Sequence, residues 1–230
     1  MRGQKLDPWV LFLRERQESL EAQGLTLENA DGLRPIFADL LKDPVTSLWT
    51  GRFRYAVLKE AIVWARETGR PLFYVEWDVK NLNGANSKLG HTGANEQVLK
   101  PLSSLIVTGV DALVQQHDGF QISFRHGGDE FSSIVGGVSN GSAFDRSKPR
   151  TLTCALDGVV RQAKSYAQRS KLDEFEHPKH LGDDRYRGTG LSYGISEFRY
   201  HPTGWMPPEA MFTEADQRVE RYKRGEVDPD

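Results

Sequence analysis

The sequence predicts an α+β domain whose mostly antiparallel sheet is flanked by helices, packed mainly on one face of the sheet. Three observations lead to this fold class. From residue 51 onward, segments of helical and strand periodicity follow one another in the order α-β-α-β-β-α-β-α. The two middle strands are joined by a glycine-rich tight turn, which makes them an antiparallel hairpin. The chain has 230 residues, of which 38% are hydrophobic, enough for one domain with appendages.

Residues 1–42 read as an N-terminal helical extension. Residues 8–22 form a helix that begins after Asp7 with a proline in its first turn. Residues 33–41 place apolar side chains at i, i+3, i+4, i+7 and i+8, which is one face of a second helix. The extension either covers the domain or serves as a dimerisation or partner-docking element. The domain itself is expected at 43–230.

The elements of the domain are predicted from periodicity and from turn residues. Helical periodicity marks four segments, at 51–67, 93–116, 152–167 and 209–224. Strands rich in β-branched and aromatic residues are expected at 72–79, 120–124, 131–135 and 189–198. The segment from Lys80 to Gly90 is rich in Asn and Gly and is predicted to be a loop. Residues 171–187 are polar and charged and read as an insertion on the surface.

Composition limits the classes of partner. The 30 basic residues are balanced by 32 acidic ones, giving a net charge of −2, which argues against a nucleic-acid polymer as ligand. The single cysteine excludes an internal disulfide and fits a reducing compartment. No apolar run approaches the roughly 18 residues of a membrane span, and the first residues lack a signal-peptide core. We therefore expect a cytoplasmic protein without a membrane partner.

The turn at Gly127 and Gly128 carries the strongest chemical signal. Asp129 and Glu130 follow the two glycines at once, and apolar strands lie on both sides. Adjacent carboxylates on a tight turn repel each other unless a cation lies between them. Asp78 ends the preceding strand and supplies a third carboxylate if the strands are neighbours. This cluster predicts a site for Mg²⁺ or Mn²⁺, shared with the phosphates of a nucleotide.

The same residues reveal a family resemblance. Residues 127–131 read Gly-Gly-Asp-Glu-Phe, the signature of the GGDEF domain, which is the catalytic domain of diguanylate cyclases. Further blocks resemble the family's motifs, in its order and near its spacing. Residues 43–48 are similar to D-x-L-T-G-L, 86–95 to N-D-x-x-G-H-x-x-G-D, 191–196 to S-x-G-I-A and 215–223 to A-D-x-A-L-Y-x-A-K. The resemblance spans about residues 43 to 225.

The resemblance implies a palm-like fold, ferredoxin-like and related to nucleotidyl cyclases, and a reaction. Two domains face each other as a homodimer, each holding one GTP, and each 3′ oxygen attacks the α-phosphate of the partner's GTP. The products are cyclic di-GMP and two pyrophosphates. Positioning and neutralisation of phosphate charge are the main demands of such chemistry.

The family's residue roles carry over onto matching positions. The resemblance implies that Asp78 and Glu130 hold Mg²⁺ with the Val79 carbonyl, and that Asp129 lies near the 3′-hydroxyl or a second metal as a base. It also implies substrate contacts from the Gly127 and Gly128 backbone, from Asn86 to the guanine edge, and from Lys223 to the terminal phosphates.

Asn95 stands where the family usually has an aspartate that accepts from guanine. An amide offers one acceptor and one donor group, so it can pair with guanine and can also match adenine. This departure leaves open ATP as a substrate and a mixed or adenine-containing cyclic dinucleotide as product.

Three other motifs depart from the family's pattern. The Arg-x-x-Asp product-inhibition site is absent, since Asp118 and Gln121 stand there. Residues 49–52 read Trp-Thr-Gly-Arg in place of x-N-R-R. A second basic residue of the last helix would fall on Val227, and Arg224 or Arg221 could substitute for it. These departures keep a second interpretation open, in which a catalytically weak or degenerate domain binds nucleotide as a signalling or interaction module.

Overall fold

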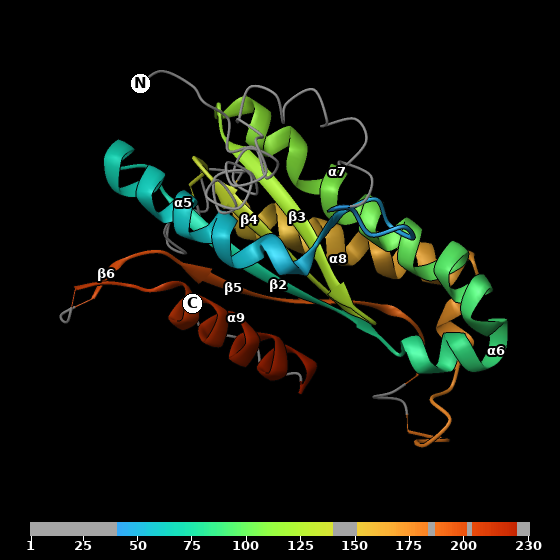
Figure 1. Cartoon of the computed structure of the whole chain (residues 1–230). Helices are drawn as coiled ribbons and strands as arrows, with labels where there is room; N and C mark the ends of the chain where they lie inside the picture. The colour runs from blue at the N-terminus through green and yellow to red at the C-terminus, as the bar shows by residue number, and fades with distance from the viewer. Residues whose placement is uncertain (1–40, 140–150, 184–186, 202–203, 225–230) are drawn as a thin grey trace, which may run out of the picture.

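A five-stranded sheet runs through the domain and carries helices on both faces (Figure 1). The computed structural model describes residues 41–139, 151–183, 187–201 and 204–224. The strand order is β1-β3-β4-β2-β5, and only the β1–β3 pair is parallel. The strands are β1 (Trp49–Thr50), β2 (Leu72–Lys80), β3 (Phe120–Gly127), β4 (Glu130–Gly136) and β5 (Gly190–Glu197). This confirms the predicted mostly antiparallel sheet, while the extension predicted at 1–42 lies, apart from its last two residues, outside the described residues.

The helices form two layers, not one. Helices α6 (Leu82–Ala94), α7 (Lys100–Gln116) and α8 (Leu152–Arg169) cover one face, and α5 (Arg54–Thr68) and α9 (Pro208–Lys223) cover the other. The expectation that helices pack mainly on one face is therefore wrong. The reason lies in β2, where Phe73 and Val75 join one core cluster while Leu72 and Tyr74 join the other. A strand buried on both sides needs a helical layer on each.

The segment predicted as a loop at Lys80–Gly90 is helical, so that prediction is wrong. Asn81 adopts a left-handed conformation (φ 56°), and its side chain accepts a hydrogen bond from the Gly84 N–H, which caps α6. Leu82 and Ala85 are buried in the core. Burial of these apolar residues outweighs the poor helix propensity of the Asn and Gly residues around them.

A π-helical turn, η3 (Asn95–Leu99), joins α6 to α7, and α6 itself is kinked at Gly90. The continuous helical run Leu82–Gln116 is long and apolar enough, by length and composition, to cross a membrane. In this structure, however, Val98, Leu102, Ile106 and Val110 are buried against the sheet. The run is thus the core helix of the larger layer.

Several short elements carry no periodicity that the sequence reveals. They are η2 (Gly51–Phe53), η4 (Leu172–Glu174) and a second, two-stranded sheet of β6 (Tyr200–His201) and β7 (Gly204–Trp205). The described part of 171–187 is mostly exposed, as predicted, but Leu172 is buried and anchors it. The Asn81 side chain also donates to the Phe175 carbonyl at 2.9 Å, which ties this segment to the start of α6.

Candidate functional site

The β3–β4 hairpin ends in an exposed turn at Gly127 and Gly128. Their φ angles are 146° and 51°, in the region that disfavours other residues, so the turn requires glycine. A Cβ atom added to either would meet nothing within 4 Å. The glycines are therefore needed for the backbone conformation of the turn, and the space around the turn is open to a ligand.

The carboxylates predicted to converge lie at this end of the sheet. Asp78 is the register partner of Glu130 across the β2–β4 pair, so their side chains leave neighbouring strands side by side. The Val79 N–H donates to the Asp129 carbonyl at 2.9 Å, which fixes the turn against the end of β2. Glu130 is exposed and Asp129 half-buried. The tip of the hairpin and the carboxyl end of β2 lie beside α6 (Figure 1).

Asp78 is paired with a lysine. Its side chain is only 16% exposed, and the Lys223 Nζ atom lies 2.8 Å from Oδ2. Burial raises the pKa of Asp78, and the charge of Asp129 adds to the increase against the opposing effect of Lys223. Burial would lower the pKa of Lys223, but hydrogen bonds to Asp78 and Glu220 outweigh it and raise that pKa. The two partners thus shift in the same direction because burial dominates at the carboxylate and pairing at the ammonium.

The carboxylate and carbonyl oxygens at this end of the sheet are ligands that suit a hard divalent cation. Among the described residues, no three acidic, His or Cys side chains are already gathered around one point. Mg²⁺ is nevertheless commonly held by one or two carboxylates, with substrate phosphates and water completing its shell. The Lys223 ammonium on Asp78 shows that this position already attracts a cation. Asp78 and Glu130 would hold the metal, with Asp129 and the Val79 carbonyl beside them.

A buried polar network lies behind the carboxylates and was not predicted. Glu76 precedes Asp78 by two residues on the same face of β2, and its side chain is 15% exposed. The Tyr74 hydroxyl donates to Glu76, and the His126 Nε2 atom lies 3.7 Å from its Oε1. Burial raises the pKa of Glu76 to about 7, and burial together with the Arg54 charge lowers that of His126 to about 3. A charged residue inside the apolar segment 72–79 was the signal available in the sequence.

Arg125 holds the turn from its other side. Its Nη1 atom donates to Asp43 Oδ1 at 3.0 Å, and its Nη2 atom donates to the Gly128 carbonyl at 2.9 Å. Burial would raise the pKa of Asp43, but hydrogen bonds from Thr46 and Arg125 lower it overall. The guanidinium therefore connects the chain entering the domain to the tip of the hairpin.

Comparison with solved structures identifies the fold. The coiled coil and GGDEF domain of DgcB from Caulobacter crescentus, in complex with c-di-GMP, aligns with a TM-score of 0.60 and 18% identity, over 94% of this chain and 95% of that one. The diguanylate cyclase SiaD from Pseudomonas aeruginosa, in complex with its activator SiaC, aligns at 0.57 and 17%, over 92% and 71%. The FimX GGDEF domain from Pseudomonas aeruginosa aligns at 0.53 and 18%, over 80% and 94%. The chain has the GGDEF-domain fold. No protein-family model and no curated protein matches the sequence.

In this GGDEF fold, the residues expected to bind the base lie on the helical layer. Asn86 is on α6, and Asn95 begins the π-helical turn η3, a feature frequent at functional sites. Both are half-buried, and within the described part of the chain their side-chain amides make no hydrogen bond. Arg224 follows Lys223 at the end of α9 and is exposed. Val227 lies outside the described residues.

Asp118 and Gln121 occupy the positions where the GGDEF product-inhibition motif would lie, and both make other contacts. The Asp118 carbonyl accepts from Arg70 Nη1 at 2.9 Å, and Gln121 Nε2 donates to the Ile106 carbonyl at 3.2 Å. Asp118 also has a left-handed backbone conformation, with φ 47°. These two residues therefore stabilise the connection between α7 and β3.

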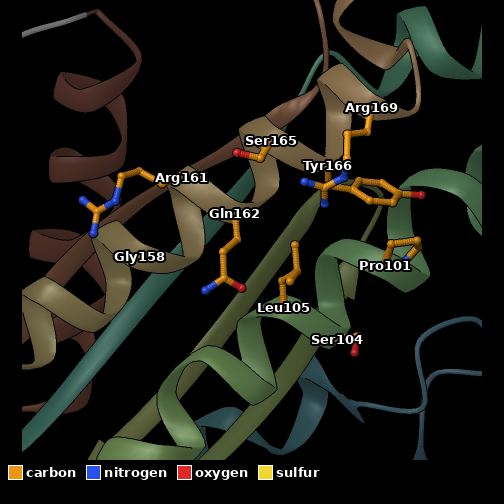
Figure 2. Close-up of a pocket in the computed structure, with 9 residues that line it drawn as sticks. All are labelled: Pro101, Ser104, Leu105, Gly158, Arg161, Gln162, Ser165, Tyr166 and Arg169. Atoms are coloured by element: carbon orange, nitrogen blue, oxygen red, sulfur yellow. The ribbon is translucent and has the colours of Figure 1, made fainter.

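A separate cavity of about 600 Å³ opens between α7 and α8 (Figure 2). It lies in the larger helical layer, and none of the predicted site residues lines it. The lining residues are Pro101, Ser104, Leu105, Gly158, Arg161, Gln162, Ser165, Tyr166 and Arg169. This cavity is thus distinct from the carboxylate site at the hairpin.

Proposed function

We propose that this protein is a magnesium-dependent diguanylate cyclase that condenses two GTP molecules into cyclic di-GMP and two pyrophosphates. It acts as a homodimer in which each subunit holds one GTP. Manganese is expected to replace magnesium. The solved neighbours, one bound to c-di-GMP and one described as a diguanylate cyclase, support this proposal through their fold.

One observation carries the proposal. Asp78 and Glu130 face each other across β2 and β4 beside an open glycine turn, with the Lys223 ammonium 2.8 Å from Asp78. Two carboxylates, a cation and an accessible backbone at one edge of a sheet are what a triphosphate and its metal require.

Each residue has a chemical task in this proposal. Magnesium, when bound, supplies charge neutralisation at the phosphates. Asp78 and Glu130 bind it, and the backbone at Gly127 and Gly128 approaches the phosphates. Lys223 moves from Asp78 to the terminal phosphates, where Arg224 adds a second positive charge. Asp129 takes the proton of the 3′-hydroxyl as that oxygen attacks the α-phosphate of the partner's GTP, and pyrophosphate leaves.

The test is direct. Purified protein is incubated with GTP and Mg²⁺, or with Mn²⁺, and the products are separated by chromatography. Cyclic di-GMP and pyrophosphate in a 1:2 ratio are expected, without slowing as product accumulates, because Asp118 and Gln121 replace the inhibitory motif. Absence of any cyclic dinucleotide at concentrations that support dimers would exclude the proposal.

A second candidate is a cyclase of altered purine selectivity. The observation in its favour is Asn95, whose half-buried amide has no hydrogen-bond partner among the described residues and offers both a donor and an acceptor. An equimolar mixture of GTP and ATP tests it. A mixed or adenine-containing product supports this candidate, and cyclic di-GMP alone argues against it.

A third candidate is a non-catalytic module that binds a nucleotide for signalling. The features in its favour are Gly51 and Val227, which stand where the resemblance places basic residues. Calorimetry that shows nucleotide binding, together with absent turnover, would support it.

A further inference from the structure

His126 occupies an unusual place beside the turn. The β3–β4 register shifts between Arg125 and Gly127, so His126 is the extra residue of a β-bulge. Bulges re-aim the backbone that follows them and are frequent next to active sites. Here the residue that follows is Gly127, the first residue of the turn, and the His126 side chain is only 10% exposed.

The ring of His126 joins three other elements. Arg54 at the start of α5 contacts Nδ1 at 2.8 Å, and the Ser132 hydroxyl of β4 contacts Nε2 at the same distance. Glu76 of β2 lies 3.7 Å from Nε2. The same Arg54 Nη1 atom also lies 3.2 Å from Nε2, so the guanidinium contacts both ring nitrogens. The ring therefore fixes the bulge to α5, β4 and β2 together.

Gly51 provides the space for this ring. A Cβ atom at residue 51 would lie 2.6 Å from His126 Nδ1 and 2.8 Å from its Cα atom. The resemblance places an arginine of the x-N-R-R motif at this position, which the His126 ring and backbone would exclude. Gly51 therefore packs directly against the backbone and the ring of His126.

Arg54 is itself held in place. Its guanidinium stacks over the ring of Phe212 from α9, 4.8 Å from the ring centroid, and its Nη1 atom reaches the Tyr74 hydroxyl at 3.5 Å. The Tyr74 side chain is fully buried. Arg54 therefore links α9 and β2 to the bulge at His126.

We propose that Arg54, His126 and Glu76 are positioning residues and that Gly51 leaves room for the His126 ring. Together they fix the position of the Gly127–Gly128 turn and of Glu130 during the reaction. This rests on the proposed function. None of these side chains is required to touch the nucleotide. They act by holding the backbone on which phosphate and metal are bound, where a displacement of about 1 Å costs on the order of a hundredfold in rate.

The experiment compares Arg54→Met with Arg54→Lys and with a control. Arg66→Met makes the same change on the same helix, at an exposed residue that contacts Trp205. The first measurement is hydrogen exchange of the Val79 amide, whose acceptor is the Asp129 carbonyl of the turn. The Val75 amide, in the middle of β2, serves as the internal reference. The second measurement is kcat and KM for GTP.

We expect Arg54→Met to increase exchange at Val79 about tenfold relative to Val75, Arg54→Lys to restore most of the protection, and Arg66→Met to change neither amide. With turnover, kcat should fall about tenfold or more while KM changes less than about threefold. Equal acceleration at both amides, or unchanged exchange at Val79, would overturn the positioning role. If the wild-type protein forms no cyclic dinucleotide, the proposed function fails, and the exchange measurement still decides the positioning role.

Discussion

Glu76 and His126 are ionisable side chains that the fold buries within reach of each other, and their protonation affects stability in opposite directions. The pKa of His126 falls from 6.5 to about 3, so the unfolded chain binds the extra proton and stability increases with pH up to about 6.5. The pKa of Glu76 rises from 4.5 to about 7, so the folded protein binds the extra proton and stability decreases as pH rises above 4.5. Between pH 4.5 and 6.5 the two contributions nearly cancel.

Single substitutions should reveal each contribution. For Glu76→Gln, the free energy of unfolding should increase with pH by about 1.4 kcal/mol per unit between pH 4.5 and 6.5, relative to the wild type. For His126→Asn, the slope should have the opposite sign. Urea denaturation at a series of pH values measures both. Parallel curves for the three proteins would contradict the assignment of these pKa values.

Substitution of Glu130 should affect catalytic turnover and leave the stability of the fold almost unchanged. Its side chain is exposed, so Glu130→Ala should change the free energy of unfolding by less than about 0.5 kcal/mol. Loss of a metal-binding carboxylate should lower turnover by about a hundredfold or more. Thermal unfolding and product formation are measured on the same preparation. A variant that retains most of the wild-type turnover would remove Glu130 from the proposed site.

Lys223 should compete with a metal ion for Asp78 when no nucleotide is present. Lys223→Gln removes the ammonium 2.8 Å from the carboxylate, so affinity for Mn²⁺ alone should increase about tenfold, while affinity for the metal–GTP complex should decrease. Electron paramagnetic resonance titration with Mn²⁺ measures the free metal. Arg224→Gln removes the same charge from the next residue and should change Mn²⁺ affinity less than about threefold. Equal effects of the two variants would indicate a general charge effect.

At the scale of elements, the start of α6 is capped by Asn81. Asn81→Ala removes the hydrogen bond to Gly84 and the tie to Phe175, and it places alanine in a left-handed conformation. We expect a loss of about 1–2 kcal/mol in the free energy of unfolding. Asn83→Ala, at an exposed position of the same helix, should change it by less than about 0.5 kcal/mol. Chemical denaturation compares the two, and equal losses would remove Asn81 from this role.

The elements also show what the sequence could reveal. Strong patterns, such as the apolar run of β2, the hairpin at Gly127 and the periodic face of α7, predicted their elements correctly. Helix α6 was missed because Asn and Gly dominate its composition, and only packing of Leu82 and Ala85 makes it helical. The second helical layer was missed although residues 72–75 are apolar without alternation, which is the pattern of a strand buried on both faces. The contacts of Arg54, distant in sequence from His126, had no local signal.

At the scale of the whole molecule, the proposed reaction requires two subunits. Turnover per subunit should therefore decrease on dilution, in step with the dimer fraction measured by sedimentation. Mixing equal amounts of wild-type and Glu130→Ala subunits should halve turnover per wild-type subunit, because about half of them then have an inactive partner. Activity that is independent of both dilution and mixing would show that a single subunit suffices.

The single thiol of the chain offers a site for a label that follows conformational change in the protein. Cys154 is exposed in the first turn of α8 and lies close enough to Tyr193 to influence its ionisation. The Tyr193 ring in turn packs against that of Tyr222, 5.7 Å between centroids, one residue before Lys223. A fluorophore or spin label attached to this thiol would need no background substitutions. If Lys223 leaves Asp78 for a nucleotide as proposed, the label should report the accompanying shift at the end of α9.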